Sequence, residues 1–398
     1  MSRSRQIAAM AAVAVVFVAA VLRGQGYAEN PPLNADEYDW AWTGLSLLQQ
    51  HVPTGWTGLW DAYGHWRVFV WQGNQYALVT PYLDHPPLFS LLVGGFGWIA
   101  GERTLTDVSL SVIRLVPMGL SLLVLGLAYR LAQATLGMWV ARISILLLAF
   151  SPATVELARI TESEALLTVW LVAALLALNR LQKRSEDRYA IGLLLASCAL
   201  APLTKVPGVA VGFAAAGVLF SWWRPRLALA AVLASIAGIL LFAAYGAVLD
   251  FGVFRQIWSA QADRHSGFSA GYELLRGGLD DWYWGLGIVG LGALATRGGG
   301  AARLVAWPVL AYVAVITLTA NADLAGRYDW YRIPIYPCIY IGAGFLIAEL
   351  ARGVRRFAPN PEDILSGRLG HSVVVLASLE ACNVAGVFES AGTYAVIQ

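Results

Sequence analysis

Residues 36–40, Asp36-Glu37-Tyr38-Asp39-Trp40, place three carboxylates within four positions, shortly after the first apolar segment of the chain. That segment, residues 7–22, is preceded by Arg3 and Arg5. The positive-inside rule therefore predicts a cytoplasmic N-terminus and an acidic cluster on the outer face. Carboxylates held against a membrane are costly to desolvate and are usually functional. A solvated loop with Asp36 as the N-cap of a helix is the structural alternative.

Composition identifies a polytopic membrane protein. Of the 398 residues, 58% are hydrophobic and 13% are charged, whereas soluble domains average about 25% charged residues. The net charge of +2 gives no electrostatic footprint for nucleic acid. Cys198, Cys338 and Cys382 lie far apart in apolar stretches, which is typical of small core residues rather than disulfides or metal ligands. We interpret residues 7–22 as a retained anchor.

The apolar segments predict a topology. Twelve of them approach spanning length, at residues 7–22, 86–100, 109–130, 138–152, 163–180, 189–203, 206–222, 227–247, 282–296, 304–320, 333–350 and 371–388. Basic loops after residues 180, 224, 297 and 352 predict the cytoplasmic side. They agree with a cytoplasmic N-terminus only if one segment between residues 23 and 163 does not cross. Segment 86–100 is short, glycine-rich and begins with Pro86-Pro87, so we predict an interfacial helix on the outer surface there. About eleven spans remain, with the C-terminal tail outside.

Five short motifs fall on the predicted outer face. They are Asp36-Glu37; Tyr82-Leu83-Asp84-His85-Pro86-Pro87-Leu88; Arg159-Ile160-Thr161-Glu162-Ser163-Glu164; Leu203-Thr204-Lys205-Val206-Pro207-Gly208; and Arg327-Tyr328 with Ile333-Pro334-Ile335-Tyr336-Pro337. In this order they resemble the membrane glycosyltransferases of the GT-C fold, most closely the protein O-mannosyltransferase and aminoarabinose transferase group. That group transfers a sugar from a polyprenyl-phosphate carrier to an acceptor hydroxyl, with inversion at the anomeric carbon.

The resemblance implies roles for individual residues. Asp36 would be the general base, and Glu37 would orient the acceptor or the base. The donor phosphate, which gains charge as it leaves, would be bound by Lys205, Arg114, Arg327 and Arg332. The pocket for donor and acceptor would include Tyr82, Asp84, His85, Glu162, His265 and Tyr328. Two structural alternatives remain open, namely a Lys205 that snorkels to the interface and a His85 that caps the helix at 86–100.

The chain departs from the group at Asp39. Aminoarabinose transferases have an arginine there that binds the carrier phosphate, so this contact cannot be carried over. Arg114 and Lys205 therefore become stronger candidates for binding the phosphate. We expect no cofactor. A divalent metal held by Asp36, Glu37, Asp84 and His85 is the alternative.

The sequence also predicts a domain organisation, in which the expected lack of a C-terminal extramembrane domain is a second departure from the group. Residues 1–350 would form a transmembrane catalytic module with outer loops at 23–108 and 248–281. Residues 351–398 would form a cytoplasmic basic loop and the final span, with no separate soluble domain. Acceptor recognition would then fall to residues 41–81 and 248–281. The first of these loops carries Trp56, Trp60, Trp66 and Trp71, which suit either sugar stacking or headgroup anchoring, and the second is long enough for a mobile lid with hinges at Gly267 and Gly271.

We therefore expect an all-α hexosyl or pentosyl transferase in a bacterial or archaeal cell membrane, with its site on the extracytoplasmic face. Its partners would be membrane lipid, a polyprenyl-phosphate-linked sugar, and a lipid, protein or polysaccharide acceptor. A transporter or flippase for the same carrier is the rival class, which would place ionisable residues within spans. A non-catalytic glycan-binding subunit is a third possibility.

Overall fold

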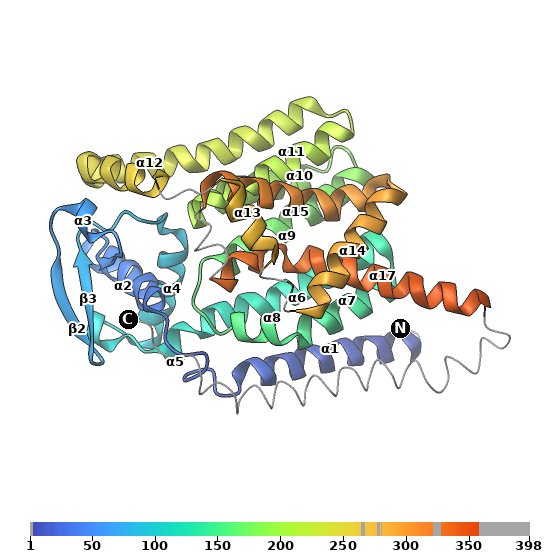
Figure 1. Ribbon diagram of the computed structural model, residues 1–398, viewed down its shortest axis with the longest axis horizontal. Coiled ribbons are helices and arrows are strands. Elements are labelled where there is room, and N and C mark those ends of the chain that lie inside the picture. Colours follow the sequence, from blue (N-terminus) through green and yellow to red (C-terminus); the bar gives the residue numbers. More distant parts are fainter. Residues whose placement is uncertain (1–2, 264–266, 277–278, 280, 321–327, 358–398) are drawn as a thin grey trace.

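Long helices lie side by side along one axis and make up most of the protein (Figure 1). The computed structural model describes residues 3–263, 267–276, 279, 281–320 and 328–357. The long helices are α1 (Arg3–Gly24), α6 (Leu115–Leu136), α7 (Met138–Phe150), α9 (Glu164–Lys183), α10 (Arg188–Thr204), α11 (Val209–Ser221), α12 (Pro225–Ala262), α14 (Trp282–Arg297), α15 (Gly299–Thr319) and α17 (Tyr336–Phe357). The short helical elements between them are α8 (Pro152–Leu157), η2 (Val206–Gly208), α13 (Phe268–Arg276) and η4 (Asp329–Ile335). The predicted helical bundle is confirmed.

The predicted outer loop 23–108 is a folded unit rather than an open loop. Its helical elements are α2 (Ala35–Gln50), α3 (Trp60–Tyr63), α4 (Pro87–Ala100) and η1 (Leu105–Asp107), and α5 (Leu110–Ile113) follows directly. Residues 35–113, which we call the end cap, lie at one end of the bundle in Figure 1.

A small antiparallel sheet within the end cap departs from the all-α prediction. Its strands are β1 (Gly55–Trp56), β2 (Arg67–Trp71) and β3 (Asn74–Val79), in the order β1-β3-β2. Trp71 pairs with Asn74 across a two-residue turn, in which Gln72 and Gly73 have φ of 48° and 81°. Two consecutive residues of positive φ form the hairpin turn that matches the twist of the strands. Strands of two to six residues are too short for a clear alternating pattern.

Helix α4 packs against α2 through glycines. A Cβ atom on Gly44 would lie 1.8 Å from the carbonyl oxygen of Ser90, and one on Gly94 would lie 2.4 Å from the backbone of Gly44. No side chain fits at either position, so the two backbones touch and α4 is fixed to α2. The helix predicted at 86–100 is thus present, while its location at a membrane surface stays a prediction.

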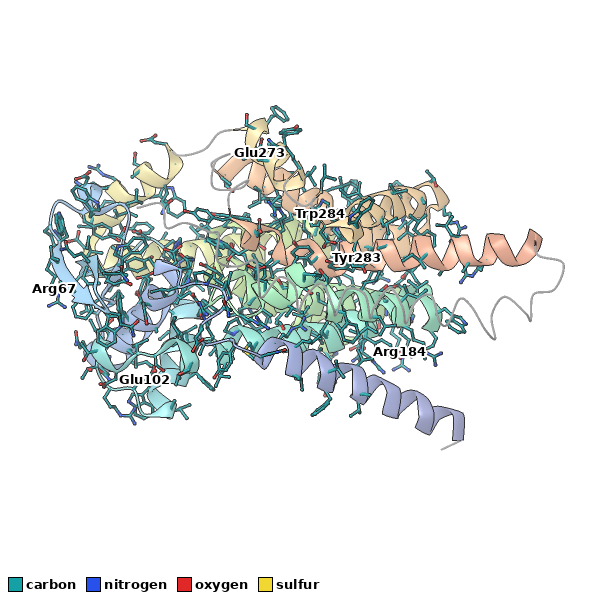
Figure 2. All side chains as sticks on the ribbon, turned by 60° about the horizontal axis from the view of Figure 1, so that its bottom comes forward. Arg67, Glu102, Arg184, Glu273, Tyr283 and Trp284 are labelled. Atoms are coloured by element: carbon teal, nitrogen blue, oxygen red, sulfur yellow. The ribbon has the colours of Figure 1, made fainter. Side chains whose placement is uncertain are left out.

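Residues predicted on opposite sides of the membrane lie toward opposite ends of the bundle, while the orientation of the bundle stays a prediction. Figure 2 shows Arg67 and Glu102 at the end-cap side and Arg184 toward the opposite end. Among the described residues, five helical stretches are long and apolar enough to cross a membrane, namely Leu110–Leu136, Glu164–Lys183, Pro225–Ala262, Gly299–Thr319 and Asp329–Gly353, and five shorter apolar helices accompany them. The number of about eleven crossings stays a prediction, and its last segment, 371–388, lies outside the described residues.

The predicted outer loop 248–281 is largely helical where it is described. Helix α12 continues to Ala262 across a break at Asp250, whose φ of −164° and ψ of 100° are extended. The Asp250 carboxylate accepts a hydrogen bond from the backbone N–H of Val253 at 2.9 Å and so caps the second part of the helix. Gly271 lies inside α13, where a Cβ would approach Thr317 to 2.1 Å. The hinge predicted at Gly271 is therefore wrong.

Candidate active site

The acidic motif lies in the first turn of α2, and Asn34 begins that helix. The Asn34 side-chain oxygen accepts a hydrogen bond from the backbone N–H of Asp36 at 3.4 Å, and the Glu37 carboxylate accepts one from the backbone N–H of Asn34 at 3.2 Å. This reciprocal capping box satisfies the free N–H groups of the first turn. Asn34 is the N-cap, so the alternative in which Asp36 has that role is wrong.

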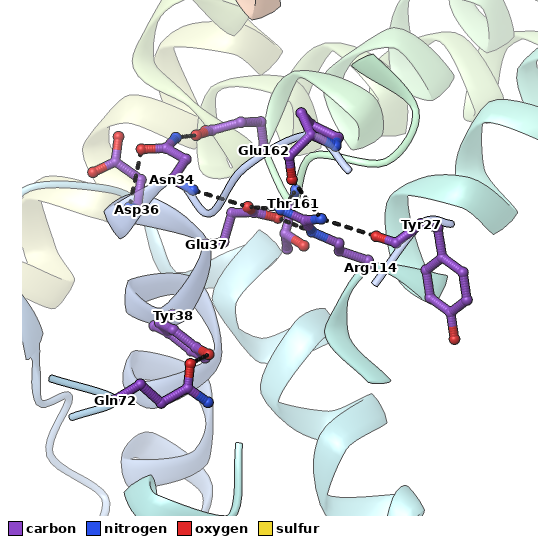
Figure 3. A network of polar contacts seen from close by, with 10 residues as sticks. Tyr27, Asn34, Asp36, Glu37, Tyr38, Gln72, Arg114, Thr161 and Glu162 are labelled. Carbon is purple, nitrogen blue, oxygen red and sulfur yellow. Dashed lines mark hydrogen bonds and ion pairs between the residues drawn. The ribbon is translucent and has the colours of Figure 1, made fainter. Parts of the chain in front are cut away.

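Glu37 points away from Asp36 into a buried ion pair. Its two oxygens accept hydrogen bonds from Arg114 at 2.8 and 2.6 Å, and the backbone N–H of Thr161 adds a third at 3.0 Å (Figure 3). Arg114 also donates to the carbonyl oxygens of Tyr27 and Pro31. Neither charged side chain is exposed. In this structure Arg114 is the partner of Glu37, and the pair joins α2 to the start of α6 and to the 160–164 turn.

Glu162 connects the same turn to α2. Its carboxylate is buried and accepts hydrogen bonds from Asn34 Nδ2 at 2.9 Å and from Trp40 Nε1 at 3.3 Å. Burial raises the pKa of Glu162 well above its usual range, and the nearby charge of Asp36 adds to this.

Lys205 lies directly after α10 and is buried rather than extended toward a surface. Its Nζ is 2.5 Å from Oε1 of Glu164 and 4.6 Å from the centre of the Tyr331 ring. A lysine that snorkels leaves its ammonium in water, whereas Lys205 is 7% exposed. The snorkelling alternative does not describe this residue.

Asp84 is held in place by two hydroxyl groups. Thr57 donates to its Oδ2 at 2.5 Å, and Tyr63 donates to its Oδ1 at 2.7 Å. The next residue, His85, stacks on Trp40 with ring centres 5.0 Å apart. His85 therefore faces α2 through an aromatic contact and adjoins the same wall of the site as Asp84.

Asp39, where the chain departs from the aminoarabinose transferases, is a buried residue of α2. It is 2% exposed and accepts a hydrogen bond from Thr43 at 3.3 Å. Burial raises the pKa of the Asp39 carboxyl well above its usual range. Tyr82, predicted in the pocket, is itself buried against Asp39 and has its ring 6.3 Å from that of His85.

Asp36 is partly exposed and lies among charged groups from four segments of the chain. Burial is the main cause that raises its pKa to about 6, and the positive charge of Lys205 opposes this rise. The carboxylates of Asp84, Glu164 and Glu37 raise the pKa further. A carboxylate with this pKa is a stronger base than an ordinary aspartate and still ionises near neutral pH.

A cavity of about 420 Å³ is lined by Asp84, His85 and Lys205, and Asp36 is not among its lining residues. The polar lining residues are Asp84, His85, Lys205, Gln261, Thr319 and Tyr331, and the apolar ones include Val206, Pro207, Phe242, Phe254, Ile257 and Trp258. Among the described residues that line it, the basic side chains are Lys205 and His85. The apolar wall comes mainly from α12 on both sides of its break, so the continuation of α12 past Asp250 helps to form the cavity.

The remaining predicted residues lie elsewhere or outside the described chain. Arg332 is buried and contacts Asp329 at 2.5 Å and the carbonyl oxygen of Leu274 at 3.1 Å. Tyr328 stacks on Trp330 with ring centres 4.3 Å apart. Arg327 and His265 are not among the described residues. Within the part of the chain that is described, no group of three or more His, Cys, Asp or Glu side chains is arranged to hold a metal ion.

The four tryptophans of the first loop separate into two kinds. Trp60 and Trp66 are 40% and 47% exposed, with ring centres 5.3 Å apart. Trp56 and Trp71 are less exposed and pack on the aromatic core of the end cap. Only the first pair, among these four, offers open ring faces to a ligand.

Sequence reasoning did not single out Asn34, Tyr63 or Tyr331. The Asn34-x-x-Glu37 spacing is a capping-box signature, which could have located the start of α2 and identified Asn34 as its N-cap. Tyr63 and Tyr331 enter the site through tertiary packing and carry no local signal.

Comparison with known proteins gives a family pattern and a fold. Residues 84–247 match the family model of dolichyl-phosphate-mannose-protein mannosyltransferases. No curated protein is significantly similar to the chain in sequence. The solved structure of ArnT from Cupriavidus metallidurans in the apo state is similar, with 17% identity and a TM-score of 0.62 over 88% of this chain and 62% of that chain.

Two further structures can be compared. The same ArnT bound to undecaprenyl phosphate gives 17% identity and a TM-score of 0.60 over 87% of this chain and 61% of that chain. Archaeal oligosaccharyltransferase AglB from Archaeoglobus fulgidus, in complex with an inhibitory peptide and a dolichol-phosphate, gives 13% identity and a TM-score of 0.49. This match covers 93% of this chain and 54% of that chain. The chain thus spans less than two thirds of the length of these proteins. It has the GT-C glycosyltransferase fold, and over residues 84–247 it resembles the protein mannosyltransferase family, as the sequence predicted.

Proposed function

We propose that this protein is an inverting glycosyltransferase that moves a sugar from a polyprenyl-phosphate carrier to an acceptor hydroxyl on the extracytoplasmic face of a cell membrane. The observation that carries the proposal is a cavity with both polar and apolar lining residues, of which Asp84 and Lys205 act on Asp36 through their charges. Asp84, His85 and Lys205 belong to its polar lining residues, and Phe242, Phe254 and Trp258 belong to its apolar ones. A lipid-linked sugar phosphate has the same two chemical characters in one molecule.

The arrangement supplies what the transfer requires. Asp36 would accept the proton of the acceptor hydroxyl as the acceptor oxygen bonds to the anomeric carbon. The bond between that carbon and the phosphate oxygen would break, and the carrier would leave as a phosphate monoester. Lys205 would stabilise the charge that develops on this leaving group, in a site with little water. The bound undecaprenyl phosphate of the similar ArnT structure supports a carrier of this chemical class.

The test uses the purified protein in lipid nanodiscs with a set of polyprenyl-phosphate-linked hexoses and pentoses. We expect one or more of these donors to release polyprenyl phosphate when a membrane extract supplies the acceptor. Asp36→Asn keeps the shape of the side chain but removes the proton acceptor, so turnover should fall by about 10²–10⁴. Wild-type turnover in a folded Asp36→Asn protein would contradict the proposed base.

A transporter of the same lipid makes a different prediction. It would move a labelled polyprenyl-phosphate sugar between the leaflets of a vesicle without consuming it. In the described structure the ionisable groups that act on one another in the site belong to the end cap, as Asp36 and Asp84 do, or lie at helix ends and turns, as Glu162, Glu164 and Lys205 do, rather than along the middle of the long helices. This placement favours transfer chemistry over transport.

A further inference from the structure

We propose that Asn34 is a positioning residue, which fastens the first turn of α2 to the 160–164 turn through Glu162 and so sets the place of Asp36 relative to Lys205. The inference rests on the proposed function, because only there does Asp36 act as a base. Asn34 touches neither cavity nor substrate in this account, and its effect passes through its neighbours.

The Asn34 side chain uses both ends of its amide. Its oxygen accepts from the backbone N–H of Asp36 at 3.4 Å, within its own helix, and its nitrogen donates to Glu162 Oε1 at 2.9 Å, on a segment 128 residues away. Figure 3 shows this link between α2 and the loop that carries Glu162. One side chain therefore joins the acidic motif of α2 to a second acidic motif.

The second motif is itself firmly held and also contacts the cation of the site. Glu162 is 1% exposed and receives a second hydrogen bond from Trp40 at 3.3 Å. Two residues later, Glu164 pairs with Lys205 at 2.5 Å. The short turn Glu162-Ser163-Glu164 thus holds Asp36 on one side, through Asn34, and Lys205 on the other.

Helix capping alone does not account for an asparagine at this position. Serine, threonine or aspartate would also cap α2. Asparagine also carries an N–H donor at the end of its side chain. Serine is too short to reach Glu162, and aspartate has no amide protons to donate. The link to Glu162 is therefore the feature that distinguishes Asn34 from other good N-caps.

The expected effect is on catalysis more than on folding. Small displacements of a reacting group, on the order of 1 Å, reduce rates by about 10². Asn34→Ser keeps a capping oxygen and removes the reach to Glu162. We expect its turnover to fall about 10- to 100-fold, with the affinity for undecaprenyl phosphate and the thermal unfolding temperature close to those of the wild type.

A reversed pair gives the matched control. In Asn34→Asp with Glu162→Gln, the glutamine amide can donate to the new carboxylate while its oxygen still accepts from Trp40. We expect this double variant to be more active than Asn34→Asp alone, because the link is restored with opposite polarity. The wild type, Asn34→Asp, Glu162→Gln and the double variant together give a double-mutant cycle for turnover.

Two outcomes would overturn the inference. One is wild-type turnover in folded Asn34→Ser, and the other is a double variant whose loss equals the product of the two single losses. Failure of the proposed function looks different, since then the wild type transfers no sugar or Asp36→Asn is fully active. A cryo-electron microscopy structure of Asn34→Ser in nanodiscs tests the positioning without any activity. We expect Asp36 to move relative to Lys205, and an unchanged first turn of α2 would refute the proposal.

Discussion

Lys205 Nζ lies 2.5 Å from Oε1 of Glu164, and the two side chains are 9% and 0% exposed. A cation that binds a leaving phosphate must be buried enough to act strongly and must also be stable before the ligand arrives. Glu164 meets the second need, because an unpaired buried ammonium would be costly. The same contact lowers the attraction that Lys205 alone would exert on a phosphate, so the donor must compete with Glu164 or share Lys205 with it.

Replacement of Lys205 should therefore be tested together with Glu164. Lys205→Ala removes the cation but leaves Glu164 buried without its partner, so part of any loss would reflect damaged packing. We expect Lys205→Met with Glu164→Gln to fold well, to bind an undecaprenyl phosphate analogue more weakly, and to turn over about 10²–10³ times more slowly. Glu164→Gln alone is the matched control and should retain phosphate affinity. Wild-type affinity in the double variant would remove Lys205 from the phosphate site.

The pH profile of transfer should report Asp36. Burial, with the nearby carboxylates, raises its pKa to about 6, and a general base must be deprotonated. We therefore expect kcat/KM to fall as the pH drops below about 6 and to level off above it. Asp84 raises this pKa and Lys205 lowers it, so Asp84→Asn should move the acid limb to lower pH and Lys205→Met should move it to higher pH. Shifts in the same direction would contradict the assignment, even if both variants are slow.

The fold could be predicted from the sequence more fully than the site. The helical bundle follows from apolar segments of spanning length, and the opposed ends follow from the basic loop at Arg184 and the acidic motif at Asp36. The sheet was missed because strands as short as Gly55–Trp56 carry almost no pattern. The helical part of the predicted loop 248–281 was missed because α12 continues to Ala262 through a break at Asp250.

Within the site, the sequence located the acidic and basic motifs but not their pairing. Asp84 and Lys205 do line one cavity, and the charges of both act on the pKa of Asp36. The contact between Glu37 and Arg114 joins residues 77 positions apart, and no local pattern encodes such a distance. Arg114 was predicted to bind the donor phosphate and Glu37 to orient the acceptor or the base, whereas the structure pairs the two side chains with each other.

Impermeant thiol labelling in intact cells tests the orientation of the bundle. Gln75, in strand β3 of the end cap (Figure 1), and Arg184, toward the opposite end of the bundle (Figure 2), are both exposed. We expect a cysteine at position 75 to react and one at position 184 to stay unlabelled until the cells are opened, because the basic loop should be cytoplasmic. The wild-type chain gives the background of its native cysteines, of which Cys198 and Cys338 are buried. The reverse pattern of labelling would place Asp36 on the cytoplasmic side and contradict the proposed donor chemistry.

The buried pair of Glu37 and Arg114 should govern stability, in contrast to Asp36. Glu37→Gln leaves the Arg114 charge without its counterion, and loss of one member of a buried ion pair costs about 3–5 kcal/mol. We expect a clear drop in the thermal unfolding temperature of Glu37→Gln in nanodiscs, whereas Asp36→Asn should unfold near the wild-type temperature. Glu37→Gln with Arg114→Met removes both charges and should recover much of the lost stability, since no unpaired charge remains. Its recovery of turnover should be smaller, because the bidentate contact that holds the first turn of α2 is gone. If instead Glu37→Gln is as stable as the wild type but as inactive as Asp36→Asn, Glu37 acts directly in the reaction, as the sequence suggested.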